Sequence, residues 1–469
     1  MKYKLYALLF CLVSFSAVNA QQADTTLNFS LSEAINYAQT HQNSILNAQI
    51  DEQIAKNTVK QTLGIGFPQI SGNASFQDFI KIPTTFLPDF ISPSVYGVLA
   101  DKGVKDRDGN EIKVPTTGTD ALFPAKFGST YQSSVGLELT QLIFDGSYFV
   151  GLRASKTFKE LSNKNLARTR IETAVAVSKA YYSVLVSNEQ LQLVDANLQR
   201  LKKSLNDTEA FFKNGFVEKI DVDRLKVLSN NLETERGNIV RLLALNVNLL
   251  KFQMGMPIET GLTLKDSITD LQIDQMVVAA DTSAYQNRIE YSLLQTQKKL
   301  NEFDVKRYKS QVLPSLVAFG SASESFQSND FSTLFDRNFP TTVIGLRLSV
   351  PLISGGQKLY RVRNAKLEVL KVENNMLNLK NGISLEISQA QTVYQNGVQS
   401  LENQKRNMEL AKEVLRVTRV KYEQGIGSSL EVTSAETALK ESQNNYITAL
   451  YDLLINKVNL DKASGRINY

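Results

Sequence analysis

Residues 136–140, Gly-Leu-Glu-Leu-Thr, recur at residues 345–349 as Gly-Leu-Arg-Leu-Ser, 209 positions later. In both copies apolar residues alternate with small or polar ones, which is the period-two pattern of a β-strand with one apolar and one polar face. Self-similarity at a fixed offset indicates a repeated structural unit. We therefore expect a second copy of a strand-bearing unit in this chain.

The similarity extends to both sides of these strands. Residues 59–68 and 305–314 share Val-Lys followed by a proline at the end, with an offset of 246. Residues 212–215, Phe-Lys-Asn-Gly, match residues 422–425, Tyr-Glu-Gln-Gly, with an offset of 210. The smaller second offset means that the first copy carries an insertion, which falls between Phe79 and Tyr131. The sequence thus predicts an internal duplication, each copy reading helix, strand, strand, long helix, turn and helix.

The expected organisation follows from this duplication. The ranges are a signal peptide at 1–20, a first repeat at 21–255, an equatorial linker at 256–281 and a second repeat at 282–469. Within the first repeat we expect strands at about 69–78 and 132–144, an inserted extracellular loop at about 79–131 and a helical hairpin at about 147–255. Within the second we expect strands at about 315–325 and 341–352 and a helical hairpin at about 356–465.

The strands raise the question of what covers their apolar face. One apolar and one polar face fits a β-barrel with lipid outside and water inside. A half-buried sheet in a soluble protein is the alternative, since antiparallel sheets of that kind show the same alternation. Two strand pairs cannot close a barrel alone, whereas three chains would supply twelve strands.

The stretches 147–212 and 358–422 contain no proline and are predicted to be two unusually long helices. At about 1.5 Å per residue, each would extend about 90–100 Å. Apolar residues recur at every seventh position of both, a pattern typical of helices that pair as coiled coils. They are Val177, Val184, Leu191, Leu198, Leu205 and Phe212 in the first helix, and Ile387, Tyr394, Leu401, Met408, Leu415 and Tyr422 in the second. Small residues three positions further on would let neighbouring helices approach closely.

The first twenty residues have the build of a secretory signal peptide. Two lysines precede an apolar run from Leu5 to Val13, and Ala20 ends a stretch of small residues at the expected cleavage site. Cys11, the only cysteine, lies within this segment, and the bulky residues before it argue against lipidation. We expect a mature protein that leaves the cytoplasm and contains no disulfide.

Composition excludes several other classes of protein. The formal net charge is +5, from 52 basic and 47 acidic residues scattered along the chain, so there is no basic stripe for nucleic acid. His41 is the only histidine and has no partner in a metal-ligand spacing, so it is expected on a helix surface. Residues 106–111 superficially suggest a calcium loop but lack the glycine and glutamate that such a loop requires. Asp108-Gly109 is therefore interpreted as a tight turn. We expect no enzyme activity, no metal site and no cofactor.

The order and spacing of several motifs resemble those of TolC-type outer membrane efflux proteins. The motifs are Leu-Ser-Glu-Ala-Ile at 31–35, Gln-Leu-Ile-Phe-Asp-Gly at 141–146, Pro-Leu-Ile-Ser-Gly-Gly at 351–356, and the close from Tyr422 through Glu431-Val432 to Leu460 and Gly465. The resemblance implies a mixed α and β fold: a homotrimer with a twelve-stranded β-barrel in the outer membrane of a Gram-negative bacterium and a periplasmic α-helical barrel. It also implies an exit duct of a tripartite efflux or type I secretion system. Its partners would be outer-membrane lipid, a periplasmic adaptor (membrane fusion protein) and an inner-membrane RND or ABC transporter.

The resemblance also suggests site residues. Glu431 matches an acidic position that narrows the pore in the family, and Asp221 is its counterpart in the first repeat; Ser434 stands where a second acid would complete a double ring. Both acids also lie in the first turn of a helix, where the helix dipole alone would favour them. The adaptor is expected to contact the tip turns, which comprise Asn214, Gly215 and Phe216 in the first copy and Gln424, Gly425, Ile426 and Gly427 in the second.

Two rival classes remain at this point. A periplasmic coiled-coil adaptor would also have long helical hairpins and a signal peptide, but it would not duplicate an amphipathic strand pair. A coiled-coil adhesin or structural scaffold without a pore would explain the heptads and leave the strands unexplained.

Overall fold

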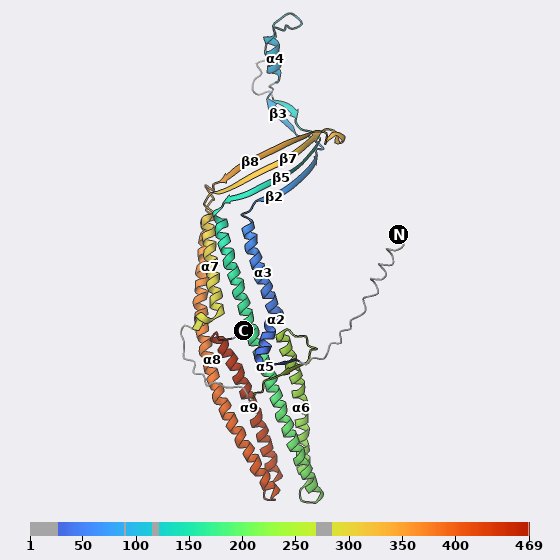
Figure 1. The fold of residues 1–469 in the computed structure, drawn as a ribbon, viewed down its shortest axis with the longest axis vertical. Helices are drawn as coiled ribbons and strands as arrows, with labels where there is room; N and C mark the ends of the chain where they lie inside the picture. The colour runs from blue at the N-terminus through green and yellow to red at the C-terminus, as the bar shows by residue number, and fades with distance from the viewer. Residues whose placement is uncertain (1–26, 89–90, 115–121, 269–283, 468) are drawn as a thin grey trace, which may run out of the picture. The chain divides into compact units, whose positions relative to one another are not determined.

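The computed structural model describes residues 27–88, 91–114, 122–268, 284–467 and 469. The predicted signal peptide, with Cys11, lies outside these residues, as do residues 269–281 of the predicted linker. The secondary structure repeats the predicted order in both copies (Figure 1). The first copy contains α2 (Leu31–His41), α3 (Asn43–Gly64), β2 (Gln69–Asp78), β5 (Tyr131–Phe144), α5 (Gly146–Lys213) and α6 (Lys219–Met254). The second contains η2 (Ala284–Asn287), α7 (Ile289–Ser310), β7 (Ser315–Ser328), η3 (Phe331–Thr333), β8 (Asn338–Ser349), α8 (Gln357–Glu423) and α9 (Ser429–Ala463).

Two compact units share these elements, and each unit draws on both copies. One contains the described parts of residues 1–58, 154–302 and 364–469, and it is helical apart from two short strands; we call it the helical unit. The other contains residues 59–153 and 303–363, and we call it the sheet unit. The duplication is therefore not a division into two separate domains.

The sheet unit is built on a four-stranded antiparallel sheet in the order β2-β5-β7-β8. Its register places Ile70, Leu139, Gly320 and Ile344 side by side in one cross-strand row. The three large residues of this row are exposed by 72, 41 and 87% respectively, so one face of the sheet is apolar and uncovered in the single chain. β2 and β8 are the edges, each with one side left unpaired within the sheet.

A glycine in β5 permits this strand to pair closely with β7. A Cβ atom on Gly136 would lie 2.7 Å from Ser323 Cβ and 2.9 Å from the carbonyl oxygen of Ala322. Contacts that short do not occur, so any larger residue would push the strands apart. The glycine at the start of the quoted Gly-Leu-Glu-Leu-Thr stretch thus has a packing role.

The insertion in the first copy contains more structure than a loop. β3 (Thr84–Pro88) pairs with β4 (Leu122–Lys126), and α4 (Ile91–Asp101) lies between them in the chain. The tight turn expected at Asp108-Gly109 is confirmed: the Asp106 carboxylate accepts hydrogen bonds from the backbone N–H groups of Asp108 and Asn110, and Gly109 has φ +82°. The helix α4 was not expected from the sequence.

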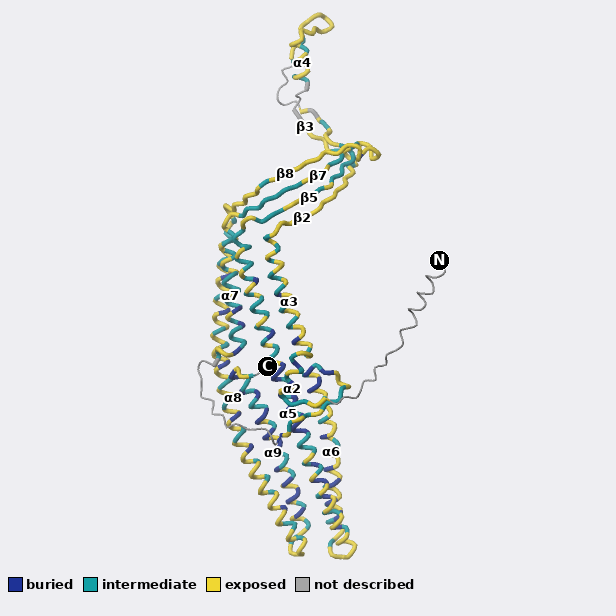
Figure 2. The backbone as a smooth tube through the Cα atoms, in the orientation of Figure 1, coloured by how far each residue is buried: buried dark blue, intermediate teal, exposed yellow. Residues whose placement is uncertain are grey.

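The core of the helical unit follows the heptad pattern. Val177, Val184, Leu198, Tyr394 and Leu401 are all at most 9% exposed. Figure 2 shows buried residues along α5 and α9, in dark blue. The small residues also act as expected, because a Cβ on Gly397 of α8 would lie 3.3 Å from Leu453 Cδ1 of α9. In the first copy the pattern ends before the turn, since Phe212 is 42% exposed, whereas its counterpart Tyr422 packs against a buried cluster.

The two copies use the same joint where each returning helix ends. A Cβ on Gly255 would lie 2.6 Å from the carbonyl oxygen of His41, and one on Gly465 would lie 3.1 Å from that of Asn287. The residue after His41 and the residue after Asn287 then cap these helices. Gln42 donates to the carbonyl oxygens of Phe252 and Gln253 at the end of α6, both at 3.2 Å. Arg288 donates to the carbonyl oxygen of Ala463 at the end of α9, at 3.0 Å. These pairs are related by the offsets of 246 and 210 read from the sequence.

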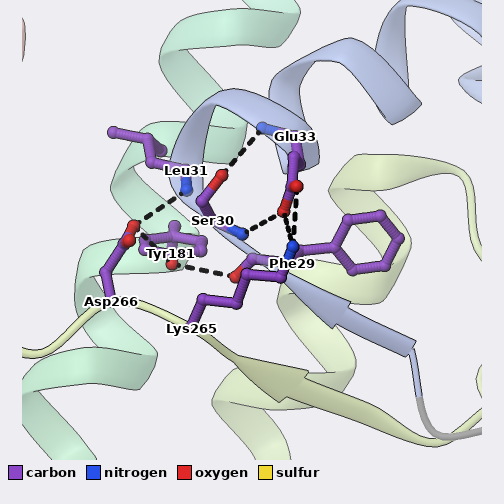
Figure 3. A network of polar contacts seen from close by, with 7 residues as sticks. All are labelled: Phe29, Ser30, Leu31, Glu33, Tyr181, Lys265 and Asp266. Atoms are coloured by element: carbon purple, nitrogen blue, oxygen red, sulfur yellow. Dashed lines mark hydrogen bonds and ion pairs between the residues drawn. The ribbon is translucent and has the colours of Figure 1, made fainter.

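A short parallel strand pair fastens the N-terminal described residues to this unit. β1 (Leu27–Phe29) pairs with β6 (Leu262–Leu264), which belongs to the predicted linker. As Figure 3 shows, the Tyr181 hydroxyl of α5 donates to Asp266 Oδ2 at 2.7 Å and contacts the carbonyl oxygen of Phe29 at 3.1 Å. Burial and the neighbouring Asp266 carboxylate raise the pKa of Tyr181 well above its usual range.

The same network fixes the start of α2. Ser30 and Glu33 form a capping box, and Glu33 also makes an ion pair of 2.7 Å with Lys265. The Leu31 N–H donates to Asp266 Oδ2 at 3.0 Å, so the linker holds the first turn of α2. Across the described residues, no helix has a sufficiently long and apolar stretch to cross a membrane.

Candidate functional site

The tip turns of the two hairpins have the same backbone geometry. Gly215 and Gly425 adopt φ values of +77° and +75°, which favour glycine. In the first turn the Phe216 N–H donates to the Phe211 carbonyl at 2.9 Å, and the Gly215 N–H donates to that of Phe212 at 3.0 Å. The second turn repeats both bonds at equivalent residues. This pair of bonds is the Schellman motif, which satisfies the last carbonyl groups of a helix.

Each tip turn presents a large apolar side chain to solvent. Phe216 is 79% exposed and Ile426 is 77% exposed. In the first copy Asn214 adds a side-chain bond to the carbonyl of Ala210 at 2.8 Å, while Gln424 occupies that place in the second. Gly427 stands where the first copy has Val217, and a Cβ on Gly427 would lie 3.0 Å from the backbone nitrogen of Tyr422.

The two predicted gate acids lie in different surroundings. Asp221 is in the first turn of α6, its side chain is 17% exposed, and its Oδ1 lies 3.5 Å from Arg224 Nη1. Glu431 is exposed in the first turn of α9, where Ser428 Oγ accepts a hydrogen bond from its backbone N–H at 3.2 Å. No ion pair of Glu431 occurs among the described residues. No hydrogen bond or ion pair joins these two acids among the described residues.

A cavity of about 270 Å³ lies between the two hairpins close to the tip turns. Its lining comes from both copies, comprising Ser204, Asp207, Thr208, Ala210, Phe211 and Leu225 with Arg419, Tyr422, Glu423, Ser429 and Val432. The Tyr422 hydroxyl is buried without a hydrogen-bond partner in the described part of the chain. Sequence reasoning placed Tyr422 in the heptad seam and gave no sign of this cavity.

Sequence reasoning also missed a layer of polar contacts between the hairpins. Asn197 Nδ2 of α5 donates to Gln443 Oε1 of α9 at 2.7 Å. Arg200 Nη2 of α5 lies 3.6 Å from Glu436 Oε2 of α9. Lys440 of α9 forms an ion pair with Glu235 of α6. Only one sign of these contacts is present in the sequence: polar residues stand between apolar positions along the same helices.

Metal chemistry finds no support in the described residues. They contain no group of three or more histidine, cysteine or acidic side chains placed to hold an ion. His41 is exposed at the end of α2 and stacks on Tyr37, with ring centroids 3.9 Å apart, as expected for a surface residue.

Comparison with known proteins identifies relatives along most of the chain. The family model described as "Outer membrane efflux protein" matches residues 106–241 and 303–466. The alkaline protease secretion protein AprF of Pseudomonas aeruginosa is 22% identical over 358 residues, covering 75% of this chain and 72% of AprF. The outer membrane protein TolC of Salmonella enteritidis is 23% identical, covering 72% of this chain and 70% of TolC. The crystal structure of the Campylobacter jejuni CmeC outer membrane channel superposes with a TM-score of 0.70 at 16% identity, covering 93% of this chain and 85% of CmeC.

Proposed function

Since this chain belongs to the outer membrane efflux protein family, we propose that three copies of it form the exit duct of a tripartite efflux or type I secretion system. Its relatives are outer membrane channels of efflux and secretion systems, so the protein is an outer membrane channel with a TolC-like mixed α and β fold. The family is one of channels and is not known for catalysis. What we propose is the trimer, its partners and its gate.

The open edges of the sheet support the proposal that several copies of the chain assemble. A single chain ends in the unpaired edges β2 and β8, and all three strand pairs between them are antiparallel. With four strands per chain, β8 of one chain can therefore pair antiparallel with β2 of the next, and three chains give a closed sheet of twelve strands. Closure removes the free edges. The uncovered row of Ile70, Leu139 and Ile344 would then face lipid.

The duplication supports a specific contact between the helices of neighbouring chains. Within one chain, α5 of the first copy packs on α9 of the second, as the Asn197–Gln443 bond demonstrates. The equivalent pair 210 positions away is Asn407 on α8 and Glu233 on α6. No hydrogen bond or ion pair joins these two residues in the described part of the chain: Glu233 pairs with Lys202 of its own hairpin, and both residues are exposed. We assign their contact to two different copies, with α8 of one packing against α6 of the next.

A cysteine pair tests this arrangement. Asn407→Cys combined with Glu233→Cys is expected to cross-link with a short bis-maleimide, because the equivalent residues within one chain are in hydrogen-bonding contact. The mature protein should contain no other cysteine, since Cys11 lies in the predicted signal peptide. Denaturing gels should show products of two and three chains and none larger, in the outer membrane fraction.

The matched control is Arg406→Cys with Glu233→Cys. Arg406 is exposed and precedes Asn407, so the helix turns its side chain by about 100°. The trimeric duct would be contradicted by any of three results. These are equal cross-linking of both pairs, products of four or more chains, and a protein found only in the soluble fraction. The soluble outcome would favour the periplasmic adaptor or a scaffold without a pore.

The tip turns are the proposed contact for a periplasmic adaptor. Phe216 and Ile426 are apolar, exposed and held by rigid Schellman turns, as suits a contact surface for another protein. Through the adaptor, the duct would meet an inner-membrane RND or ABC transporter. The name of AprF refers to secretion of a protease and the family name to efflux, so both kinds of system are consistent with this chain.

The proposed gate is a ring of Glu431 carboxylates, with Asp221 as a second candidate. Threefold repetition of a carboxylate around a pore would attract cations and bind divalent ones. Replacing Glu431 by glutamine is expected to lower both the cation selectivity and the block by divalent cations, measured as single-channel conductance in a lipid bilayer. Glu441→Gln, an exposed acid of the same helix, serves as the control. Unchanged block in Glu431→Gln would remove Glu431 from the gate.

A further inference from the structure

The contact between α5 and α9 contains one carboxyl group that its surroundings do not satisfy. Glu436 is 9% exposed, and its helical neighbours Val432, Ala435 and Leu439 are buried in an apolar cluster. Its Oε1 has no hydrogen-bond partner in the described part of the chain. Its Oε2 has Arg200 Nη2 at 3.6 Å, which is too far for a good hydrogen bond.

Arg200 is itself only partly engaged with Glu436. Its guanidinium also bonds the Asn197 side chain, and its Nε is buried without a partner in the described part of the chain. The contact therefore lacks the bidentate geometry that makes a buried ion pair favourable. Removing a carboxylate from water without full hydrogen bonding is costly, so the charged form of Glu436 weakens this contact.

Charged groups from each neighbouring helix act on this site. Arg200 on α5 and Arg419 on α8 favour the charged carboxylate. Lys440, one turn further along α9, forms an ion pair with Glu235 of α6 instead of with Glu436. Burial is the larger influence and raises the pKa of Glu436 above its usual range, despite the two arginines. The direction agrees with the geometry: the site accommodates the neutral carboxylic acid better than the carboxylate.

The second copy of this contact provides an internal comparison. The residue equivalent to Glu436 in α6 is Lys226, and the residue equivalent to Arg200 in α8 is Leu410. Lys226 is paired with Glu209 of its own hairpin at 2.9 Å, and Leu410 is 65% exposed. The buried carboxyl group is therefore particular to the contact within one chain and absent from the equivalent contact proposed between chains.

We infer that Glu436 is a proton-operated latch that controls how firmly the two hairpins of one chain are held together. A carboxyl group that binds its proton more tightly in the packed state stabilises packing most at acidic pH. This stabilisation is lost as the pH rises and the group ionises in the packed state. Acid therefore tightens the contact between α5 and α9, and neutral pH loosens it.

The consequence for transport rests on the proposed function. If the hairpins must separate for the duct to open, protonation of Glu436 opposes opening, and the protein closes more firmly when the periplasm is acidified. The latch would then regulate the duct from within each chain and at a different place from the Glu431 ring. Glu436 is a positioning residue in this account, because it holds a helix and does not touch cargo.

A distance measurement between the hairpins tests the latch. Spin labels at Lys203→Cys on α5 and Glu441→Cys on α9, both exposed sites, report the separation by pulsed electron spin resonance. Diluting labelled chains among unlabelled ones isolates the pair within one chain. Between about pH 8 and about pH 4 we expect the population with the longer distance to be lost as the pH falls.

Three variants separate the latch from a general structural effect. Glu436→Gln carries a neutral side chain of the same shape, so its distances should remain short at every pH. Glu436→Asp keeps a carboxyl group and should retain a pH response. Glu235→Gln makes the same chemical change at the more exposed ion pair of this layer, and it should respond to pH as the wild type does.

The inference is overturned if Glu436→Gln follows the wild-type pH response, or if the wild-type distances do not change with pH. Because the distances are measured without cargo, adaptor or pump, their outcome is independent of the proposed duct. A latch that responds as expected in a protein that does not form a transmembrane pore would refute the proposed function and leave the latch intact.

Discussion

Replacing Arg288 by methionine is expected to lower the free energy of unfolding of the helical unit by about 1.5–3 kcal/mol, the scale for losing hydrogen bonds to charged groups. Arg288 is 6% exposed, and its guanidinium makes ion pairs with Glu290 at 2.9 Å and Glu386 at 3.1 Å, besides capping Ala463. Methionine would fill much of the space but would leave two carboxylates and the end of α9 without their partner. The side chains of Glu290 and Glu386 are 30 and 45% exposed, so water can solvate them in the variant, and the loss stays below that of a fully buried ion pair.

The measurement is denaturant unfolding of the purified protein followed by far-ultraviolet circular dichroism. Arg466→Met is the matched control, because Arg466 pairs with Asp461 at 3.2 Å near the same helix end but is well exposed. It should cost at most about 1 kcal/mol. A similar loss in both variants would show that the buried position of Arg288 has no special importance.

The ion pair between Arg288 and Glu290 also makes the free energy of unfolding depend on pH. Burial alone would raise the pKa of Glu290, but its hydrogen bond with Arg288 and the positive charge of that residue lower it overall. A carboxyl group with a lowered pKa in the folded state contributes stability above its unfolded pKa, and this contribution is lost as the pH falls through the folded pKa. Arg288→Met should therefore be less sensitive to acid than the wild type in that range.

Replacing Gly255 by alanine is the other substitution with a large expected effect. Its φ of +73° costs an alanine about 1–2 kcal/mol. The new Cβ would also lie 2.6 Å from the carbonyl oxygen of His41 and 2.7 Å from Gln42 Cα, both of which are backbone atoms that cannot move aside independently. Overpacking of this kind adds about 1–3 kcal/mol, so we expect a total loss of about 2–5 kcal/mol.

Gly215→Ala isolates the second contribution. Gly215 has nearly the same φ, +77°, and its surroundings leave a new Cβ with no neighbouring atom within 4 Å, so only the conformational cost remains. Unfolding of the two variants under identical conditions should differ by the cost of the collision at His41. If the two losses are equal, the joint between α2 and α6 is more pliable than its geometry indicates.

The sequence was sufficient for features that depend on local pattern and on the duplication. The hairpins were expected to end at about 255 and 465, and α6 and α9 end at Met254 and Ala463, where Gly255 and, two residues after Ala463, Gly465 adopt positive φ angles. The order of the strands was predictable because alternation is regular over β5 and β8, but β8 spans Asn338–Ser349 and not the expected 341–352. The proposed roles of Glu431 and of the tip turns remain predictions, since no contact within one chain tests them.

What the sequence could not supply were contacts between distant residues of unlike type. Glu436 resembles any exposed glutamate of a long helix until α5 is packed against it. Arg288 follows a short stretch without periodicity, and its partner Glu386 is 98 residues away. β1 and β6 are three residues each, too short for a pattern, and exist because the linker offers a backbone for pairing.

The open edges of the sheet have a consequence for the life of the protein before assembly. A newly exported chain carries β2 and β8 with unpaired backbone groups beside a bare apolar row. Such edges are templates for indiscriminate strand addition, and hence for aggregation. Such a chain needs protection by a chaperone or rapid pairing of its edges with other copies, so for the proposed trimer the yield of correct assembly depends on the rate of synthesis. Overproduction should favour aggregates, whereas slow expression should favour the functional assembly.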